Sequence, residues 1–297
     1  MFSKKKGNQS MNKNVKILAL ILLIVIVVVL LLFFNIKNNG NDNNKEIIAV
    51  SIMPEKEFVR AVAGEDFKII SMIPSGASPE NYEPTPMEKE TFEESVIYFS
   101  IGVPTEENNI LPNVSENTKL VKLDEVVREE YADLTFANGS RDPHIWLSPQ
   151  RAMVMVQKIA DELSELKPQN KEKYQENAKK YISELENSIL EIDSLLAQKG
   201  NRKFIVYHPA FAYLADEFGL EMYALEEDGK EATVESLKEK IDLAKKEGIK
   251  YIFYQAEIDS SQAKAFAEEI GGQTMMLEPL AENYLENLKK MANLLAE

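Results

Sequence analysis

Histidine is scarce in this chain of 297 residues, which contains only His144 and His208. His144 lies in "RDPHIWLSP", residues 141–149, next to the only tryptophan and between two prolines. His208 ends the apolar run "KFIVYH" and is followed by Pro209. Imidazole is a common ligand of divalent transition metals, although a single histidine more often packs as a hydrogen-bonded structural residue. The two positions are therefore candidate metal ligands.

Two carboxylates stand at comparable points of the sequence. Glu80 follows "FKIISMIP" across the turn "SGASP", and Glu278 follows "TMML". Open α/β sheets bind ligands just beyond the carboxyl ends of their strands, where these groups and His208 would lie. Two neutral imidazoles and two carboxylates make an uncharged set around a divalent cation. We predict a metal site formed by Glu80, His144, His208 and Glu278, with Asn81 as the alternative to Glu80 if the loop shifts by one residue.

The elements that must position these groups follow an α/β pattern from Glu46 onward. Short apolar runs such as "EIIAVSI", "SVIYFSIG" and "IKYIFYQ" alternate with amphipathic stretches, which predicts parallel sheets. After Pro168, apolar residues at helical spacing continue up to Gly200, predicting one helix of about 30 residues and about 45 Å. We expect two parallel-sheet α/β lobes, residues 46–167 and 200–297, joined by a long helix at 168–199. A coiled-coil excursion from one domain would give a similar pattern.

The first 45 residues have a different composition. Ile17 to Phe34 is an unbroken apolar run of 18 residues, preceded by five lysines. This length and charge asymmetry predict a transmembrane signal anchor at 17–36, a cytoplasmic tail at 1–16, a polar tether at 37–45 and an extracytoplasmic soluble part. A cleaved signal peptide is the competing interpretation, but the run lacks an A-x-A-like cleavage site. The chain has no cysteine, which excludes a lipid-modified cysteine, disulfides and thiolate ligands.

The charge balance excludes one class of partner. Residues after Lys37 retain all 49 acidic residues but only 28 of the 34 basic ones, which leaves a net charge of −21. Nucleic acid is therefore not expected as a partner. The acidic surface is typical of a soluble protein and attracts cations weakly.

Four ordered segments resemble the zinc/manganese solute-binding proteins of ATP-binding-cassette (ABC) metal importers. They are "SGASPENYEPTP", "DPHIWLSP", "YHPAFAYLADEFGL" and "LEPLAENYLENLKKM", and the resemblance covers residues 46–297. It implies two α/β lobes bridged by a rigid helix, with one metal ion in the cleft. It also implies that His144 and His208 are metal ligands.

The chain departs from the family pattern at three positions. Glu80 replaces a histidine, Glu278 replaces an aspartate, and Gln255 stands where many members have glutamate. The histidine-rich loop of typical zinc members is also missing between the first two ligand segments. Replacing an imidazole by a carboxylate shifts the donor set from one that suits zinc towards one that suits manganese or ferrous iron.

The resemblance implies a binding protein and not an enzyme. We expect a monomer that captures one divalent transition metal ion, zinc or manganese with iron possible, and delivers it to an ABC permease in the same membrane. The long helix restricts hinge opening, so motion should be small. An anchored metallohydrolase is one alternative, with Glu83 as the spare carboxylate, but the chain has no HExxH motif. An adhesin or scaffold with a degenerate metal site is the other alternative.

Overall fold

The computed structural model describes residues 45–297 apart from 199, 228–229, 232 and 259–260. Residues 46–297 form one compact unit. The predicted tail, anchor and most of the tether lie outside the described residues. Within the described part, no helix is both long and apolar enough to cross a membrane.

The first lobe contains a parallel sheet of order β2-β1-β3-β4. Its strands are β1 (Ile47–Val50), β2 (Lys68–Ser71), β3 (Ser95–Ser100) and β4 (Lys119–Lys122). Its helices are α2 (Met53–Ala63), α3 (Pro86–Glu93), α4 (Leu123–Glu130) and α5 (Pro149–Leu166). Of these elements, β4, α3 and α4, which have four, eight and eight residues, are not predicted from the sequence. Elements this short show few repeats of a period, even where, as in α4, one side is apolar.

The second lobe contains a parallel sheet of order β10-β9-β5-β6 and a short hairpin. The sheet strands are β5 (Lys203–Val206), β6 (Glu221–Ala224), β9 (Tyr251–Gln255) and β10 (Gln273–Leu277), and the hairpin pairs β7 (Glu226–Glu227) with β8 (Lys230–Glu231). The helices are α7 (Ala212–Glu217), α8 (Val234–Glu247), α9 (Ser261–Glu269) and α10 (Tyr284–Ala296). If the strands of each lobe are numbered 1 to 4 in chain order, both sheets have the spatial order 2-1-3-4. The two lobes therefore share one sheet topology.

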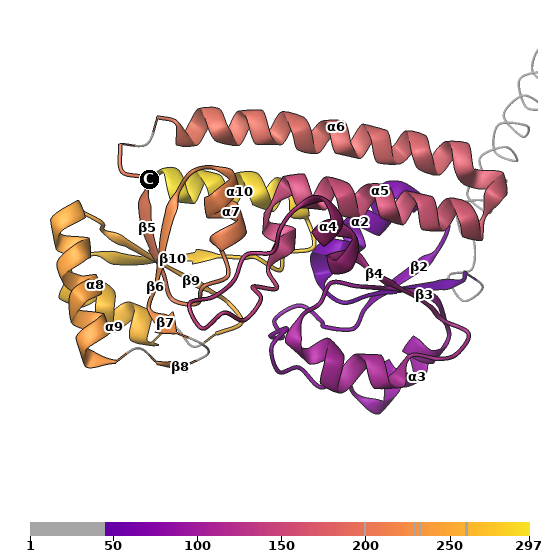
Figure 1. Ribbon diagram of the computed structural model, residues 1–297, viewed down its shortest axis with the longest axis horizontal. Coiled ribbons are helices and arrows are strands. Elements are labelled where there is room, and N and C mark those ends of the chain that lie inside the picture. The colour runs from indigo at the N-terminus through magenta and orange to yellow at the C-terminus, as the bar shows by residue number, and fades with distance from the viewer. Residues whose placement is uncertain (1–44, 199, 228–229, 232, 259–260) are drawn as a thin grey trace, which may run out of the picture. The chain divides into compact units, whose positions relative to one another are not determined.

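A single long helix, α6 (Lys171–Leu196), runs past both lobes (Figure 1). It has 26 residues, about 39 Å, and it begins after a 3₁₀ turn at Pro168–Asn170. The helix is thus shorter than predicted, because its first residues form that turn. Its apolar side packs on α5, α2 and α10, so that one apolar core extends from the first lobe into the second.

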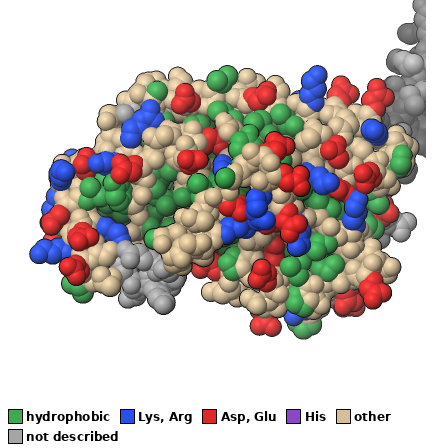
Figure 2. Space-filling model, in the orientation of Figure 1, with side chains coloured by type: hydrophobic (Ala, Val, Ile, Leu, Met, Phe, Trp, Pro, Cys, Tyr) green, Lys and Arg blue, Asp and Glu red, His purple; other side chains and the backbone are tan. Residues whose placement is uncertain are grey.

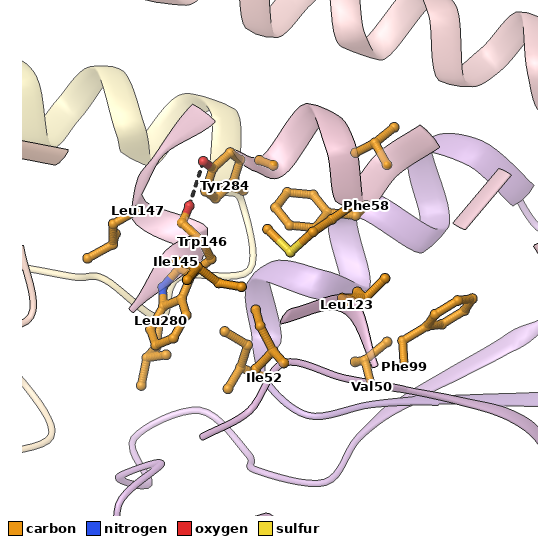
Figure 3. Packing of buried hydrophobic residues seen from close by; sticks show 14 of the residues in the cluster. Val50, Ile52, Phe58, Phe99, Leu123, Ile145, Trp146, Leu147, Leu280 and Tyr284 are labelled. Atoms are coloured by element: carbon orange, nitrogen blue, oxygen red, sulfur yellow. Dashed lines mark hydrogen bonds between the residues drawn. The ribbon is translucent and has the colours of Figure 1, made fainter. Parts of the chain in front are cut away.

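The segment 142–148 connects the lobes through hydrogen bonds. The Trp146 indole donates to the Pro279 carbonyl at 2.9 Å. The Tyr284 hydroxyl donates to the Trp146 carbonyl at 2.7 Å, as the dashed line in Figure 3 shows. The Tyr213 hydroxyl donates to the Asp142 carbonyl at 3.0 Å. Trp146 and Tyr284 are both buried, so these bonds are shielded from water. The segment that carries His144 therefore has a fixed position relative to the second lobe.

A second polar joint forms around Glu57 on α2. Its carboxylate accepts hydrogen bonds from the backbone N–H groups of Tyr284 at 2.5 Å and Leu285 at 3.3 Å, at the start of α10. It also accepts from the Tyr181 hydroxyl of α6 at 2.5 Å. A carboxylate at a helix N-terminus satisfies N–H groups that lack partners within the helix. One side chain of the first lobe therefore binds both the connecting helix and the last helix.

We predict that Glu57→Ala lowers the free energy of unfolding by about 1–3 kcal/mol, because it leaves the two N–H groups and the Tyr181 hydroxyl without this acceptor. Urea unfolding monitored by circular dichroism measures the change. Glu176→Ala, at an exposed position on α6, is the control and should stay within about 0.5 kcal/mol of the parent. Equal stability of the two variants would contradict the assigned role of Glu57.

Candidate metal site

His208 lies two residues beyond the end of β5, where the carboxyl end of a central strand meets the cleft. Its side chain is buried, and its Nδ1 lies 2.9 Å from Glu226 Oε2. Its Nε2 lies 3.1 Å from Glu80 Oε1. The bond at Nδ1 orients the ring so that Nε2 points towards the first lobe.

His144 is held by a carboxylate in a similar way. The Asp142 Oδ1 atom lies 2.7 Å from His144 Nδ1 and accepts the backbone N–H of His144 at 2.9 Å. The short 3₁₀ helix Ile145–Leu147 starts directly after it. The two imidazole rings meet nearly edge to face, with centroids 5.4 Å apart. Both rings are buried, and no histidine is visible on the face shown in Figure 2.

A small cavity between the lobes joins these groups. It is lined from the first lobe by Glu80, Val103 and His144, among others, and from the second by His208, Gln255 and Glu257. Its volume is about 20 Å³, which is room for roughly one water molecule or one ion. The cavity therefore suits a small cation and not an organic substrate.

Glu80 faces this cavity, whereas Asn81 does not line it and is exposed. The loop before Glu80 is bound to the first lobe through the Pro79 carbonyl, which accepts the Thr105 N–H at 3.1 Å. The hydrogen bond with His208 lowers the pKa of Glu80, and the nearby imidazoles lower it further. The structure thus brings together three of the four predicted groups: Glu80, His144 and His208.

Glu278 is placed differently. It lines a separate hollow together with Ser75 of the first lobe and Ala281, Glu282 and Lys290 of the second. Its carboxylate is paired with the Lys290 ammonium group, and its backbone carbonyl accepts the Asn287 amide at 2.7 Å. Sequence position alone does not show this pairing, because Lys290 lies well inside the following helix.

Glu257 was missed in the sequence analysis, although it lines the cavity. It lies two residues after the end of β9, and its Oε2 atom is buried with no hydrogen-bond partner among the described residues. Burial raises the pKa of Glu257, and the charge of Glu278 raises it further. The available signal was its place just beyond an apolar strand, which is the criterion that selected His208 and Glu278. Gln255 was named instead, because many family members have glutamate at that position.

Within the described part of the chain, no three carboxylate or imidazole groups already surround a common point at ligand distance. Glu80 instead bonds directly to His208 at 3.1 Å. In a tetrahedral site with ligand distances of about 2.0–2.2 Å, two donor atoms lie about 3.4 Å apart. The hydrogen bond runs along the direction in which Nε2 would hold a cation, so the Glu80 carboxylate must swing aside before both atoms can bind the same ion.

The protonation of His208 follows from its two carboxylate neighbours. Burial by itself lowers the pKa of an imidazole, but hydrogen bonds with Glu226 and Glu80 outweigh it and raise the pKa of His208 to about 9. The metal-free ring therefore carries a proton at neutral pH and donates from both nitrogens. A cation that binds at Nε2 must displace this proton.

The amino-acid sequence of this chain is similar to a known protein family and to individual metal-binding proteins. Residues 48–297 match the family model described as "Zinc-uptake complex component A periplasmic", ZnuA. The chain belongs to the ZnuA family. It is 29% identical over 262 residues to the high-affinity zinc uptake system protein ZnuA of Bacillus subtilis, covering 82% of this chain and 79% of that protein. It is 28% identical to the zinc-binding lipoprotein AdcA of Streptococcus pneumoniae, of which it spans only 54%.

Solved structures show the same fold. A crystal structure of ZnuA is similar to this member of the family with a TM-score of 0.80 and 32% identity, covering 85% of this chain and 98% of that one. The periplasmic zinc-binding protein TroA from Treponema pallidum has a TM-score of 0.78 at 16% identity, over 85% and 98% of the respective chains. The predicted two lobes with parallel sheets and a long helix are confirmed.

We predict that one of the two imidazoles of the metal-free protein titrates at about pH 9 and that Glu226→Gln moves this pKa towards 6.5, because the main partner of Nδ1 is neutralised. NMR of the histidine rings measures both values. Since the folded-state pKa lies above the ordinary value, His208 stabilises the fold fully below about pH 6.5, and this contribution is lost as the pH rises towards 9.

Glu90→Gln, at an exposed carboxylate on α3, is the control for this titration and should leave the pKa of His208 unchanged. A parent protein in which His208 titrates near pH 6.5 would contradict the direct bonding of this ring to the two carboxylates.

Proposed function

We propose that this protein captures a divalent transition metal ion, zinc or manganese, in the cleft between its lobes and delivers it to the permease of an ABC importer. The carrying observation is the pair of buried imidazoles 5.4 Å apart, each with its Nδ1 bonded to a carboxylate. Metal-binding histidines are commonly oriented by this type of bond, which leaves Nε2 for the ion. Membership of the ZnuA family supports the same function.

The lining of the cavity supports three ligands of the ion: Glu80, His144 and His208. The sequence prediction names Glu278 as the fourth ligand. A site with similar numbers of nitrogen and oxygen donors suits zinc, manganese and ferrous iron. Oxygen donors favour manganese and iron, whereas zinc binds more tightly than manganese at most mixed sites. The B. subtilis and streptococcal relatives are zinc proteins by name, which supports zinc as one cargo.

The proposed mechanism is capture and release without chemistry on the ion. The hydrogen bond between Glu80 and His208 breaks, the ion binds at Nε2 while the proton of His208 is released to water, and the Glu80 carboxylate then binds the ion from the first lobe. Hydrogen bonds from Trp146, Tyr213 and Tyr284 keep the lobes together, so only local motion is required. Glu83 is exposed and does not line the cavity, so it gives no support to a hydrolytic base.

The proposed location is outside the cytoplasm, with the soluble part held at the membrane by residues 17–36. The family description "periplasmic" supports the compartment, and the apolar run in the sequence supports the anchor. Anchoring next to a permease raises the local concentration of the loaded protein. We propose a monomer as the transport-competent form.

We predict that the metal-stripped full-length protein binds about one zinc or manganese ion, and that His144→Ala and His208→Ala each weaken binding by at least about 100-fold, more than is usual for loss of a supporting residue. Native mass spectrometry and competition with a fluorescent chelator measure stoichiometry and affinity.

Glu83→Gln is the control, since it removes a carboxylate charge near the site but not from the cavity. Circular dichroism verifies that each alanine variant is folded. Folded parent protein that binds none of zinc, manganese or ferrous iron would refute the proposed function.

A further inference from the structure

The segment that follows β10 borders two different spaces. Pro279 lines the cavity of the two imidazoles, whereas the Glu278 side chain lines the neighbouring hollow together with Lys290. The backbone of this segment is fixed on both residues. The Pro279 carbonyl accepts the Trp146 indole N–H at 2.9 Å, and the Glu278 carbonyl accepts the side-chain amide of Asn287 at 2.7 Å. The Glu278 carboxylate therefore needs only a rotation of its own side chain to turn from the hollow to the cavity.

The surroundings of Glu278 allow this rotation. Its side chain is 36% exposed and that of Lys290 is 57% exposed, so their ion pair is not enclosed by the core. Rotation about the side-chain bonds of a glutamate moves its carboxylate by several ångströms. Glu278 also lies near the cavity already. Burial raises the pKa of Glu257, which lines the cavity, and the charge of Glu278 raises it further.

Both predicted carboxylate ligands have a cationic partner in the metal-free protein. Glu80 pairs with the His208 ring, and Glu278 pairs with the Lys290 ammonium group. A group that binds only the metal-free form of a ligand competes with the metal for it, and the metal shifts the population towards the unpaired form. Loading then exchanges the cationic partners of both carboxylates for one dication.

The Lys290 ammonium group has a second carboxylate within reach. Glu286 precedes Lys290 by four residues on α10 and lines the same hollow. Side chains four residues apart on a helix are neighbours and form ion pairs. The departure of Glu278 therefore does not leave the ammonium group without an acidic neighbour, which keeps the cost of the exchange low.

We infer that Lys290 holds Glu278 outside the cavity in the metal-free protein, and that Glu278 leaves Lys290 and turns into the cavity as the fourth ligand when the ion binds. This inference rests on the proposed function. Lys290 does not touch the ion and is a positioning residue that acts through Glu278. Its competition for the carboxylate lowers the affinity for the ion, which eases release to the permease.

The test compares Lys290→Gln with the matched variant Lys289→Gln in the metal-stripped full-length protein. Both exchanges remove one lysine charge from α10, but Lys289 pairs with Glu191 of α6 at 2.6 Å. We expect Lys290→Gln to tighten Zn²⁺ binding about 2–5-fold, as loss of a competing exposed ion pair should do. Lys289→Gln should leave the affinity unchanged. Lys290→Arg keeps the ion pair and should bind as the parent does. Competition with a fluorescent chelator measures each affinity.

A double-mutant cycle with Glu278→Gln distinguishes this role from a general effect of charge. Glu278→Gln alone should weaken Zn²⁺ binding about 10-fold or more, because it removes a ligand. In that background Lys290→Gln should cause no further change, since Lys290 acts through the Glu278 carboxylate. Tightening that persists at full size in the Glu278→Gln protein would reflect the loss of a nearby positive charge and would overturn the inference.

The outcomes also separate the inference from the proposed function. A parent protein that binds Zn²⁺ or Mn²⁺, with Lys290→Gln binding no more tightly, would overturn the inference and leave the proposed function intact. Parental affinity in Glu278→Gln would do the same. A folded parent protein that binds neither ion would overturn both. Circular dichroism verifies that each variant is folded.

Discussion

The position of the segment 142–148 is the constraint on which the rest of the structure depends. This segment belongs to the first lobe by sequence, but the second lobe contributes its hydrogen-bond partners at Tyr213, Pro279 and Tyr284. The two imidazoles therefore lie in one frame, although they are far apart in the chain. Because Glu57 and α6 join the same two lobes, wide opening would break several buried and partly buried hydrogen bonds together. Selective capture of a small ion benefits from such a frame, since the distances between donors stay nearly constant.

The electrostatics of the cleft are suited to the exchange of a proton for a dication. Asp142 and Glu226 each bond to an imidazole Nδ1, and Glu80 bonds to the Nε2 of His208. In the metal-free state the proton on His208 balances part of this negative charge. A divalent cation can replace it because its charge is balanced by the same carboxylates. The groups that hold the metal-free site together are thus the groups that favour loading.

Much of this arrangement was predictable from the sequence, for identifiable reasons. Long apolar runs and a 26-residue amphipathic helix carry strong periodicity, so the two sheets and α6 were predicted. His144 and His208 stand out because they are scarce and lie next to prolines. The short elements β4, α3 and α4 were missed because four to eight residues contain too few repeats of a period to be recognised. Glu257 and Glu278 follow neighbouring strands, and the sequence does not show that Glu257 lines the cavity whereas Glu278 contacts Lys290.

The central claim is that one ion binds between the lobes at the two imidazoles. Anomalous X-ray diffraction from crystals of the protein grown with zinc or manganese, recorded on both sides of the metal absorption edge, tests it directly. The account predicts one strong peak within about 2.0–2.3 Å of Nε2 of both His144 and His208, with a Glu80 oxygen in the same shell. A peak outside the cavity, or no peak in a folded protein with both rings still bonded to Asp142 and Glu226, would contradict it.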